Sequence, residues 1–214
     1  VVESRIKIGR ATPEDLGRMM AMLSTATSHA SLADCDVVVE AVTENETLKT
    51  GVYEQLAPLL GPETILASNT STISITRMSA AAPNAEQFAG LHFFYPVDRM
   101  QLVEVIRGEG TSDQTIATLV QLARRVGKTP IVMKDCPGFL VNRILLPYMA
   151  ESLQLMCEGA TIDAIDRAAT KFGMPMGPIA LHDLVGLDTA LYAGRVVSTA
   201  YSDRALDFPI LEDL

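Results

Sequence analysis

A histidine and a glutamate, His92 and Glu104, have the chemistry of a general base and of the group that orients it. His92 ends an apolar run before a polar turn, and Glu104 interrupts the apolar run that follows the turn. Both lie equally far from Asp98, so a chain that folds back there sets the two side chains opposite each other. A carboxylate on one imidazole nitrogen fixes the tautomer and leaves the other nitrogen free to accept a proton. The spacing agrees equally well with a proton-transfer pair and with a solvent-facing glutamate on an edge strand.

Other polar groups have two interpretations each. Hydroxyl and amide side chains gather in residues 68–72, SNTST, where they either cap a following helix or bind a polar ligand at its positive end. Asn142 lies within an otherwise apolar stretch, as a satisfied interior amide or as a substrate anchor. The three histidines, His29, His92 and His182, lack the spacing of metal ligands, so we expect no metal site.

The elements that must position these side chains alternate between strand and helix in the first part of the chain. Short apolar runs predict strands at residues 36–42, 64–67, 88–94, 102–106 and 130–133. Amphipathic stretches predict helices at residues 46–60, 73–82 and 113–126. Such alternation is typical of β-α-β units, and ligands of open α/β sheets bind beyond the carboxyl ends of strands, where His92 falls.

After residue 136 the strand signals stop, and helical patterns follow at residues 139–157, 162–172 and 187–200. We therefore predict an α/β fold in which a nucleotide-binding type of sheet is followed by an all-α domain. One more helix is expected at residues 13–23, with Thr12 as its N-cap. Its methionines, Met19, Met20 and Met22, are interpreted as core or docking residues.

Composition excludes several classes of protein. The chain has 214 residues and a formal net charge of −9, so nucleic acid is not an expected partner. Its apolar runs are far shorter than the roughly 20 residues that a membrane helix needs, so no membrane segment is expected. Three widely spaced cysteines form no disulfide framework and favour a reducing compartment.

Five short motifs occur in the order and spacing of one known family. They are SNTS at 68–71, HFFYP at 92–96, LVE at 102–104, PGFLVNR at 137–143 and MGP at 176–178. Together they resemble the L-3-hydroxyacyl-CoA dehydrogenase family. The stretches GKTPIV at 127–132 and NRILLPY at 142–148 most closely resemble the dehydrogenase part of its multifunctional fatty acid oxidation α subunits. The resemblance implies a partial Rossmann-type NAD-binding domain at residues 1–136 and a partial helical dehydrogenase domain at residues 137–214.

The resemblance also implies a reaction, the NAD-dependent oxidation of L-3-hydroxyacyl-CoA to 3-ketoacyl-CoA in fatty acid β-oxidation. His92 matches the general base that takes the proton of the 3-hydroxyl while hydride passes from C3 to NAD. Glu104 matches the residue that orients the base. Ser71 and Asn142 match catalytic positions that hold the substrate, and Ser71 also matches a position at the nicotinamide end of the cofactor.

The cofactor contacts that the resemblance implies are Val42, Thr43, Glu44, Lys49, Ser71 and Tyr95. Without the resemblance, Glu44 and Lys49 would be interpreted as solvated residues on a helix surface. The family usually has Asn where this chain has Tyr95, so an amide contact beside the nicotinamide is replaced by a phenol.

The family's first strand, its glycine-rich turn and the acidic residue at the end of its second strand have no counterpart in this sequence. Residues 1–4 resemble the remains of that second strand or of the turn after it. The G-x-G at 108–110 lacks the third glycine of a dinucleotide fingerprint. The family's helical domain also continues beyond the position of Leu214. We therefore expect the 214 residues alone to bind NAD weakly and to turn over slowly or not at all.

Two other functions remain open beside the dehydrogenase. One is a non-catalytic acyl-CoA-binding or assembly fragment, and the other is a related hydroxyacid dehydrogenase. The resemblance implies 3-hydroxyacyl-CoA as the molecule bound, either a homodimer or a multienzyme complex with thiolase as the assembly, and a cytoplasmic location.

Overall fold

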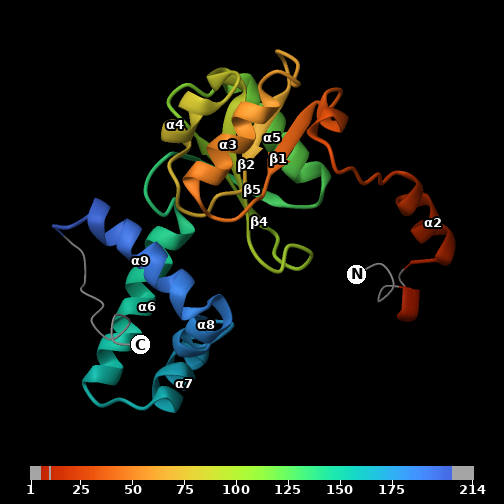
Figure 1. The fold of residues 1–214 in the computed structure, drawn as a ribbon. Helices are drawn as coiled ribbons and strands as arrows, with labels where there is room; N and C mark the ends of the chain where they lie inside the picture. Colours follow the sequence, from red (N-terminus) through yellow and green to blue (C-terminus); the bar gives the residue numbers. More distant parts are fainter. Residues whose placement is uncertain (1–5, 10, 204–214) are drawn as a thin grey trace.

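The computed structural model describes residues 6–9 and 11–203. An α/β part built on one sheet is followed along the chain by a group of helices beneath it (Figure 1). The interpretation of residues 1–4 as the remains of a strand lies outside the described residues, as do the outer ends of the two predicted domains.

The sheet has five strands in the order β1-β2-β3-β4-β5. They are β1 (Val37–Glu40), β2 (Ile65–Ser68), β3 (Phe88–Phe93), β4 (Leu102–Arg107) and β5 (Thr129–Lys134). The first three strands are parallel, β4 runs antiparallel to β3, and β5 is parallel to β4. All five predicted strands are present, and the reversal after β3 is the predicted fold-back near Asp98.

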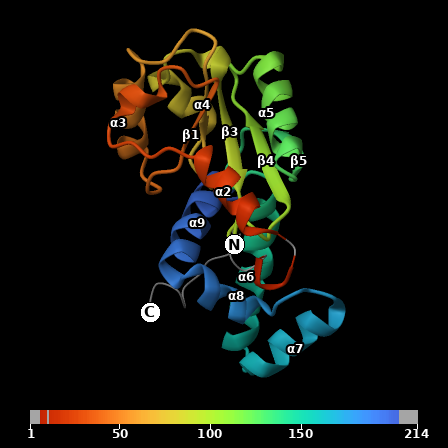
Figure 2. The same ribbon diagram turned by 90° about the vertical axis from the view of Figure 1, so that its right-hand side faces the viewer.

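Helices cover both faces of this sheet (Figure 2). α3 (Glu46–Leu56) and the short α4 (Ile75–Met78) lie on one face, and α5 (Asp113–Arg125) lies on the other. Successive strand residues point to opposite faces, so Leu66 packs in the core beneath α3 while its neighbour Ala67 packs beneath α5. The sheet therefore has a buried apolar core on each side, and polar side chains that matter for function collect at its strand ends.

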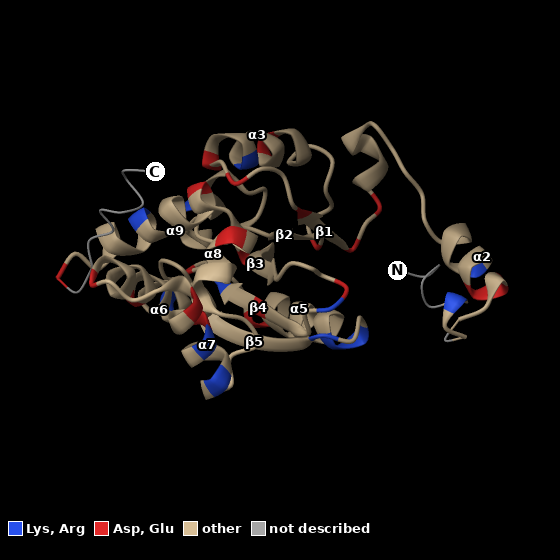
Figure 3. Ribbon diagram, turned by 90° about the horizontal axis from the view of Figure 1, so that it is seen from below, with Lys and Arg blue, Asp and Glu red and all other residues tan. Residues whose placement is uncertain are grey.

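Charge at the helix ends follows the helix dipole. Ser112 caps α5, Asp113 lies in its first turn, and Arg124 and Arg125 lie in its last turn. The ribbon near this end of α5 has the blue of Lys and Arg in Figure 3. The predicted helix at 113–126 thus begins and ends close to the expected residues.

Four helices follow the sheet: α6 (Val141–Cys157), α7 (Ile162–Phe172), α8 (Pro178–Val185) and α9 (Leu187–Ala200). The sequence pattern did not predict α8, whose N-terminal N–H groups at Ile179 and Ala180 are capped by the carboxylate of Asp166 on α7. A β-carbon on Gly177 would stand 2.1 Å from the Asp166 Cγ, so glycine is required for this cap. Among the described residues, none of the helices is long and apolar enough to cross a membrane.

The N-terminal helix α2 (Pro13–Ala21) begins with the predicted cap, because Thr12 and Asp15 exchange hydrogen bonds between side chain and backbone. It lies away from the sheet at the end of an extended segment (Figure 1). The interpretation of its methionines as core residues is wrong: Met19, Met20 and Met22 are exposed, and no residue of α2 is buried. The methionines are close together in sequence, but no other described element packs against this helix.

Candidate active site

The fold-back places His92 on β3 directly opposite Glu104 on β4. The Nδ1 atom of His92 lies 2.7 Å from the Oε2 atom of Glu104, and both side chains are buried. β4 has a neighbour on each side, and Glu104 has no exposed surface, so the alternative of a solvent-facing glutamate on an edge strand is wrong. A buried carboxylate needs hydrogen-bond donors, and the imidazole supplies one.

The second oxygen of Glu104 faces the first residues of the helical part. Its Oε1 atom accepts hydrogen bonds from the backbone N–H of Leu140 and of Val141, at 3.0 and 2.9 Å. The turn before them contains Gly138 and Phe139, which both have positive φ, and this conformation presents the two N–H groups to the sheet. Glu104 is thereby fixed at both oxygens.

The other ring nitrogen of His92 faces a polar cluster. When the Nδ1–H of His92 donates to Glu104, the Nε2 atom carries the lone pair, and it lies 3.2 Å from the hydroxyl of Ser71. The Ser71 carbonyl in turn accepts a hydrogen bond from the Asn142 side-chain amide at 3.1 Å. The four residues predicted to be catalytic therefore come together from the end of β2, from β3 and β4, and from α6.

Aromatic rings surround the imidazole on its remaining sides. The ring of Phe94 lies 4.5 Å from that of His92 between centroids, and the ring of Phe139 lies 5.9 Å away. Apolar neighbours limit the water around Nε2, which strengthens the polar contacts that remain.

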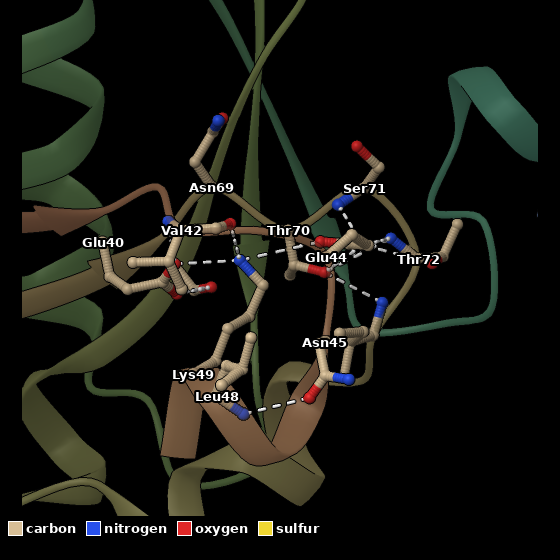
Figure 4. Close-up of polar contacts among 12 residues, drawn as sticks. Glu40, Val42, Glu44, Asn45, Leu48, Lys49, Asn69, Thr70, Ser71 and Thr72 are labelled. Atoms are coloured by element: carbon tan, nitrogen blue, oxygen red, sulfur yellow. Dashed lines mark hydrogen bonds and ion pairs between the residues drawn. The ribbon is translucent and has the colours of Figure 1, made fainter. Parts of the chain in front are cut away.

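Glu44 holds the loop that carries Ser71 (Figure 4). Its Oε1 atom accepts hydrogen bonds from the backbone N–H of Ser71 at 2.9 Å and of Thr72 at 3.0 Å, and from the Thr70 hydroxyl at 2.7 Å. Its side chain keeps 30% of its surface exposed, and its Oε2 atom lies 3.6 Å from the Nζ atom of Lys49.

Lys49 is not the solvated helix lysine that its position on α3 alone indicated. It is fully buried, and its Nζ atom lies 2.9 Å from the Glu40 carboxylate, 3.1 Å from the Val42 carbonyl and 3.6 Å from the Glu44 carboxylate (Figure 4). The interpretation failed because the burial of Lys49 depends on how α3 packs against β1, which carries Glu40.

Glu40, at the end of β1, was not among the residues predicted from the sequence. Burial by itself raises the pKa of Glu40, but hydrogen bonds from Lys49, Tyr53 and Ser68 outweigh it and hold the pKa below its usual value. The same burial raises the pKa of Tyr53, so its phenol stays a donor to Glu40. The signal was available, because Glu40 interrupts an apolar strand as Glu104 does.

The remaining predicted cofactor residues lie at the open side of this cluster. Val42 and Thr43 are exposed just beyond β1, while the Asn69 side chain points away from Glu44 (Figure 4). The Val42 N–H and carbonyl are bonded to Glu40 and Lys49, and the Asn69 oxygen accepts the Phe93 N–H. The place still fits one end of a dinucleotide, because it lies at the carboxyl ends of parallel strands. Tyr95 is 85% exposed, and its hydroxyl makes no hydrogen bond to a described residue.

A cleft of about 610 Å³ lies beside the cluster, between the sheet part and α9. Thr72 lines it, but His92 does not, so the geometry of proton transfer and this cleft are separate features. No group of three or more candidate ligands for a metal ion occurs among the residues that the structure describes.

Comparison with known proteins places this geometry in a family. Residues 1–136 match the model described as 3-hydroxyacyl-CoA dehydrogenase, NAD binding domain, and residues 138–214 match that family's C-terminal domain. The chain is 45% identical over 204 residues to the fatty acid oxidation complex subunit alpha of Acinetobacter baylyi, covering 95% of this chain and 28% of that protein. The chain therefore spans less than a third of the length of this curated relative.

Two solved structures have the same fold. The (S)-3-hydroxybutyryl-CoA dehydrogenase of Ralstonia eutropha superposes with a TM-score of 0.95 at 40% identity, over 99% of this chain and 76% of that one. The 3-hydroxybutyryl-CoA dehydrogenase of Escherichia coli superposes with a TM-score of 0.93 at 37% identity, over 99% of this chain and 46% of that one.

Proposed function

The chain belongs to the 3-hydroxyacyl-CoA dehydrogenase family, and from this premise we propose that it oxidises L-3-hydroxyacyl-CoA to 3-ketoacyl-CoA with NAD. The observation that carries the proposal is the arrangement around His92: Glu104 on Nδ1, and Ser71 with Asn142 on the side of Nε2. The alternatives are a related hydroxyacid dehydrogenase and a non-catalytic acyl-CoA-binding fragment.

In this proposal His92 is the general base. Its Nε2 atom takes the proton of the 3-hydroxyl as the C3–H bond breaks, and the Glu104 carboxylate stabilises the imidazolium that forms on the other side of the ring. Ser71 and Asn142 hold the oxygen of the substrate beside Nε2, since the Ser71 hydroxyl already lies there. The rings of Phe94 and Phe139 keep water from competing for the proton.

NAD, when bound, supplies the acceptor of the hydride. The residues that we propose to hold it are Val42, Thr43, Glu44, Lys49, Ser71 and Tyr95. Val42 and Thr43 offer exposed surface beyond β1, Glu44 offers a side chain that is 30% exposed, and Lys49 supports Glu44 from beneath. Tyr95 offers its phenol and an exposed ring in place of the family's usual amide.

The test is NADH formation from L-3-hydroxybutyryl-CoA and saturating NAD. His92→Gln should lower the rate by at least about 100-fold, because the general base is lost. His29→Gln is the matched control, since His29 is exposed on a short 3-10 helix and should leave the rate unchanged. A slow but His92-dependent rate is the expected result for these 214 residues.

Three outcomes would overturn the proposal. Equal rates for the protein and its His92→Gln variant would show that His92 is not the general base. Binding of acyl-CoA without NADH binding, unchanged in His92→Ala, would indicate a binding or assembly fragment. Faster oxidation of a free hydroxyacid than of the CoA thioester would indicate a related hydroxyacid dehydrogenase.

We also propose how the segment is organised. The division is placed between residues 136 and 137, supported by the change from strands to helices there. The assembly is either a homodimer or a multienzyme complex with thiolase, in a cytoplasmic location, since the curated relatives are named as subunits of a bacterial fatty acid oxidation complex. Light scattering of the chain alone and with an added thiolase subunit separates the two assemblies.

A further inference from the structure

A buried cluster beneath the candidate site is built around Glu40, to which neither the sequence nor the family resemblance gave a role. Glu40 is 4% exposed, and each of its carboxylate oxygens accepts two hydrogen bonds. The donors are the Val42 N–H at 2.7 Å and Lys49 Nζ at 2.9 Å on Oε1, and the hydroxyls of Tyr53 and Ser68, both at 2.8 Å, on Oε2. Both oxygens of the carboxylate have their donors, and these hydrogen bonds fix its orientation.

We infer that Glu40 is a positioning residue for the dehydrogenation, which fixes the Ser71 loop against His92 through two connections. The inference rests on the proposed function, because the reaction gives the Ser71–His92 distance its meaning. Glu40 itself touches neither His92 nor the open side of the site.

The first connection passes through Lys49. A buried ammonium must stay paired, because removing a partner leaves an uncompensated charge. Glu40 anchors Lys49, and Lys49 faces the Oε2 atom of Glu44 at 3.6 Å. The other oxygen of Glu44 then accepts the N–H of Ser71. Without the anchored lysine, Glu44 loses its ion pair and is held only by the donors of the loop itself, so the loop and its acceptor can shift together.

The second connection is direct and acts on the chain just before the loop. The Ser68 hydroxyl donates to the Glu40 side chain, and the Asn69 N–H donates to the Glu40 carbonyl at 2.8 Å. β2 therefore ends in a fixed direction, three residues before the Ser71 hydroxyl that lies 3.2 Å from the Nε2 atom of His92. Both connections end on the same short loop.

A core ion pair with no link to function would change stability and leave His92 unaffected. The distinguishing readout is the ¹⁵N resonance of His92 Nε2 at one fixed pH, in protein labelled at its three histidines. Ser71→Ala supplies the reference, because it deletes the hydroxyl from Nε2. His29 and His182 supply signals that should stay in place.

Glu40→Gln should move the His92 Nε2 resonance toward its position in Ser71→Ala, and should move it little further when Ser71 is already Ala. Its kcat should fall about 10-fold with KM changed less than about 2-fold, since a misplaced group impairs the chemical step more than binding. Glu46→Gln is the matched control, because Glu46 lies on the surface in an ion pair with Arg77.

An unmoved His92 resonance in a folded Glu40→Gln protein would overturn the inference, as would shifts that simply add in the double variant. If Glu40→Gln does not fold, Tyr53→Phe removes one donor to Glu40 and should give a smaller shift of the same sign. No shift in Tyr53→Phe would then count against the inference. The proposed function fails separately, if turnover does not depend on His92 while the resonance still moves.

Discussion

Replacing Glu104 by Gln tests the core of the site with one atom. The carboxylate has donors on both sides, the Nδ1–H of His92 on one oxygen and the N–H groups of Leu140 and Val141 on the other. An amide has one acceptor oxygen and one donor NH₂. When its oxygen faces the two N–H groups, the NH₂ must donate to Nδ1, and the ring proton moves to Nε2. The nitrogen that should accept the substrate proton is then blocked.

The magnitude follows from this wrong tautomer. Loss of the acidic partner that sets a catalytic histidine's tautomer lowers kcat about 10⁴-fold in serine proteases, and we expect about 10³- to 10⁴-fold here. Stability should fall less. Charge-assisted hydrogen bonds become neutral ones, which costs about 1 kcal/mol each, but the desolvation of a buried charge is relieved, so we expect a net loss of about 1–2 kcal/mol.

The assay measures both quantities on the same preparations. NADH formation from L-3-hydroxybutyryl-CoA gives kcat, and urea unfolding followed by circular dichroism gives the free energy of unfolding. Glu109→Gln is the matched control, because Glu109 is exposed just beyond β4. A folded Glu104→Gln protein that keeps kcat within about 10-fold of the unchanged protein would refute the tautomer argument.

Three further predictions concern stability. Gly177→Ala should cost about 2–4 kcal/mol in urea unfolding, because its β-carbon displaces the Asp166 carboxylate from the α8 N-terminus, and it should cost little when Asp166 is already Ala. Burial lowers the pKa of His182 below its usual 6.5, so the unfolded chain binds more protons just below pH 6.5. The free energy of unfolding should therefore fall as pH drops below about 6.5, and this fall should be smaller in His182→Gln. Gly90→Ala should lower the melting temperature, because its β-carbon would stand 2.8 Å from that of Ile106; an unchanged value would contradict the packing.

The parts of the fold that could be predicted are those set by local pattern. The five strands and α5 follow from apolar periodicity, and the pairing of His92 with Glu104 follows from a turn placed midway between them. In each case a pattern within one element, or one turn between neighbouring strands, decides the structure. The family resemblance then added roles that periodicity alone does not contain.

The parts that could not be predicted depend on contacts between different elements of the fold. α8 begins at Pro178, which is a local start signal, but the side chain that caps its N-terminus is Asp166 from another helix. Lys49 looks like a surface lysine until β1 places Glu40 beneath it. The methionines of the N-terminal helix are expected in the core or at a docking surface, but no residue of α2 is buried, because residue type alone does not show what packs on a helix.

The two-sided hold on Glu104 has a consequence for molecules that are still folding. Its Oε2 atom has its partner, His92, within the sheet, whereas its Oε1 atom has its donors only at the start of α6. A chain whose sheet has formed before its helices dock has an imidazole with a loosely held carboxylate and no Asn142 beside Ser71. The full set of contacts around His92 therefore requires both the sheet and the docked start of α6.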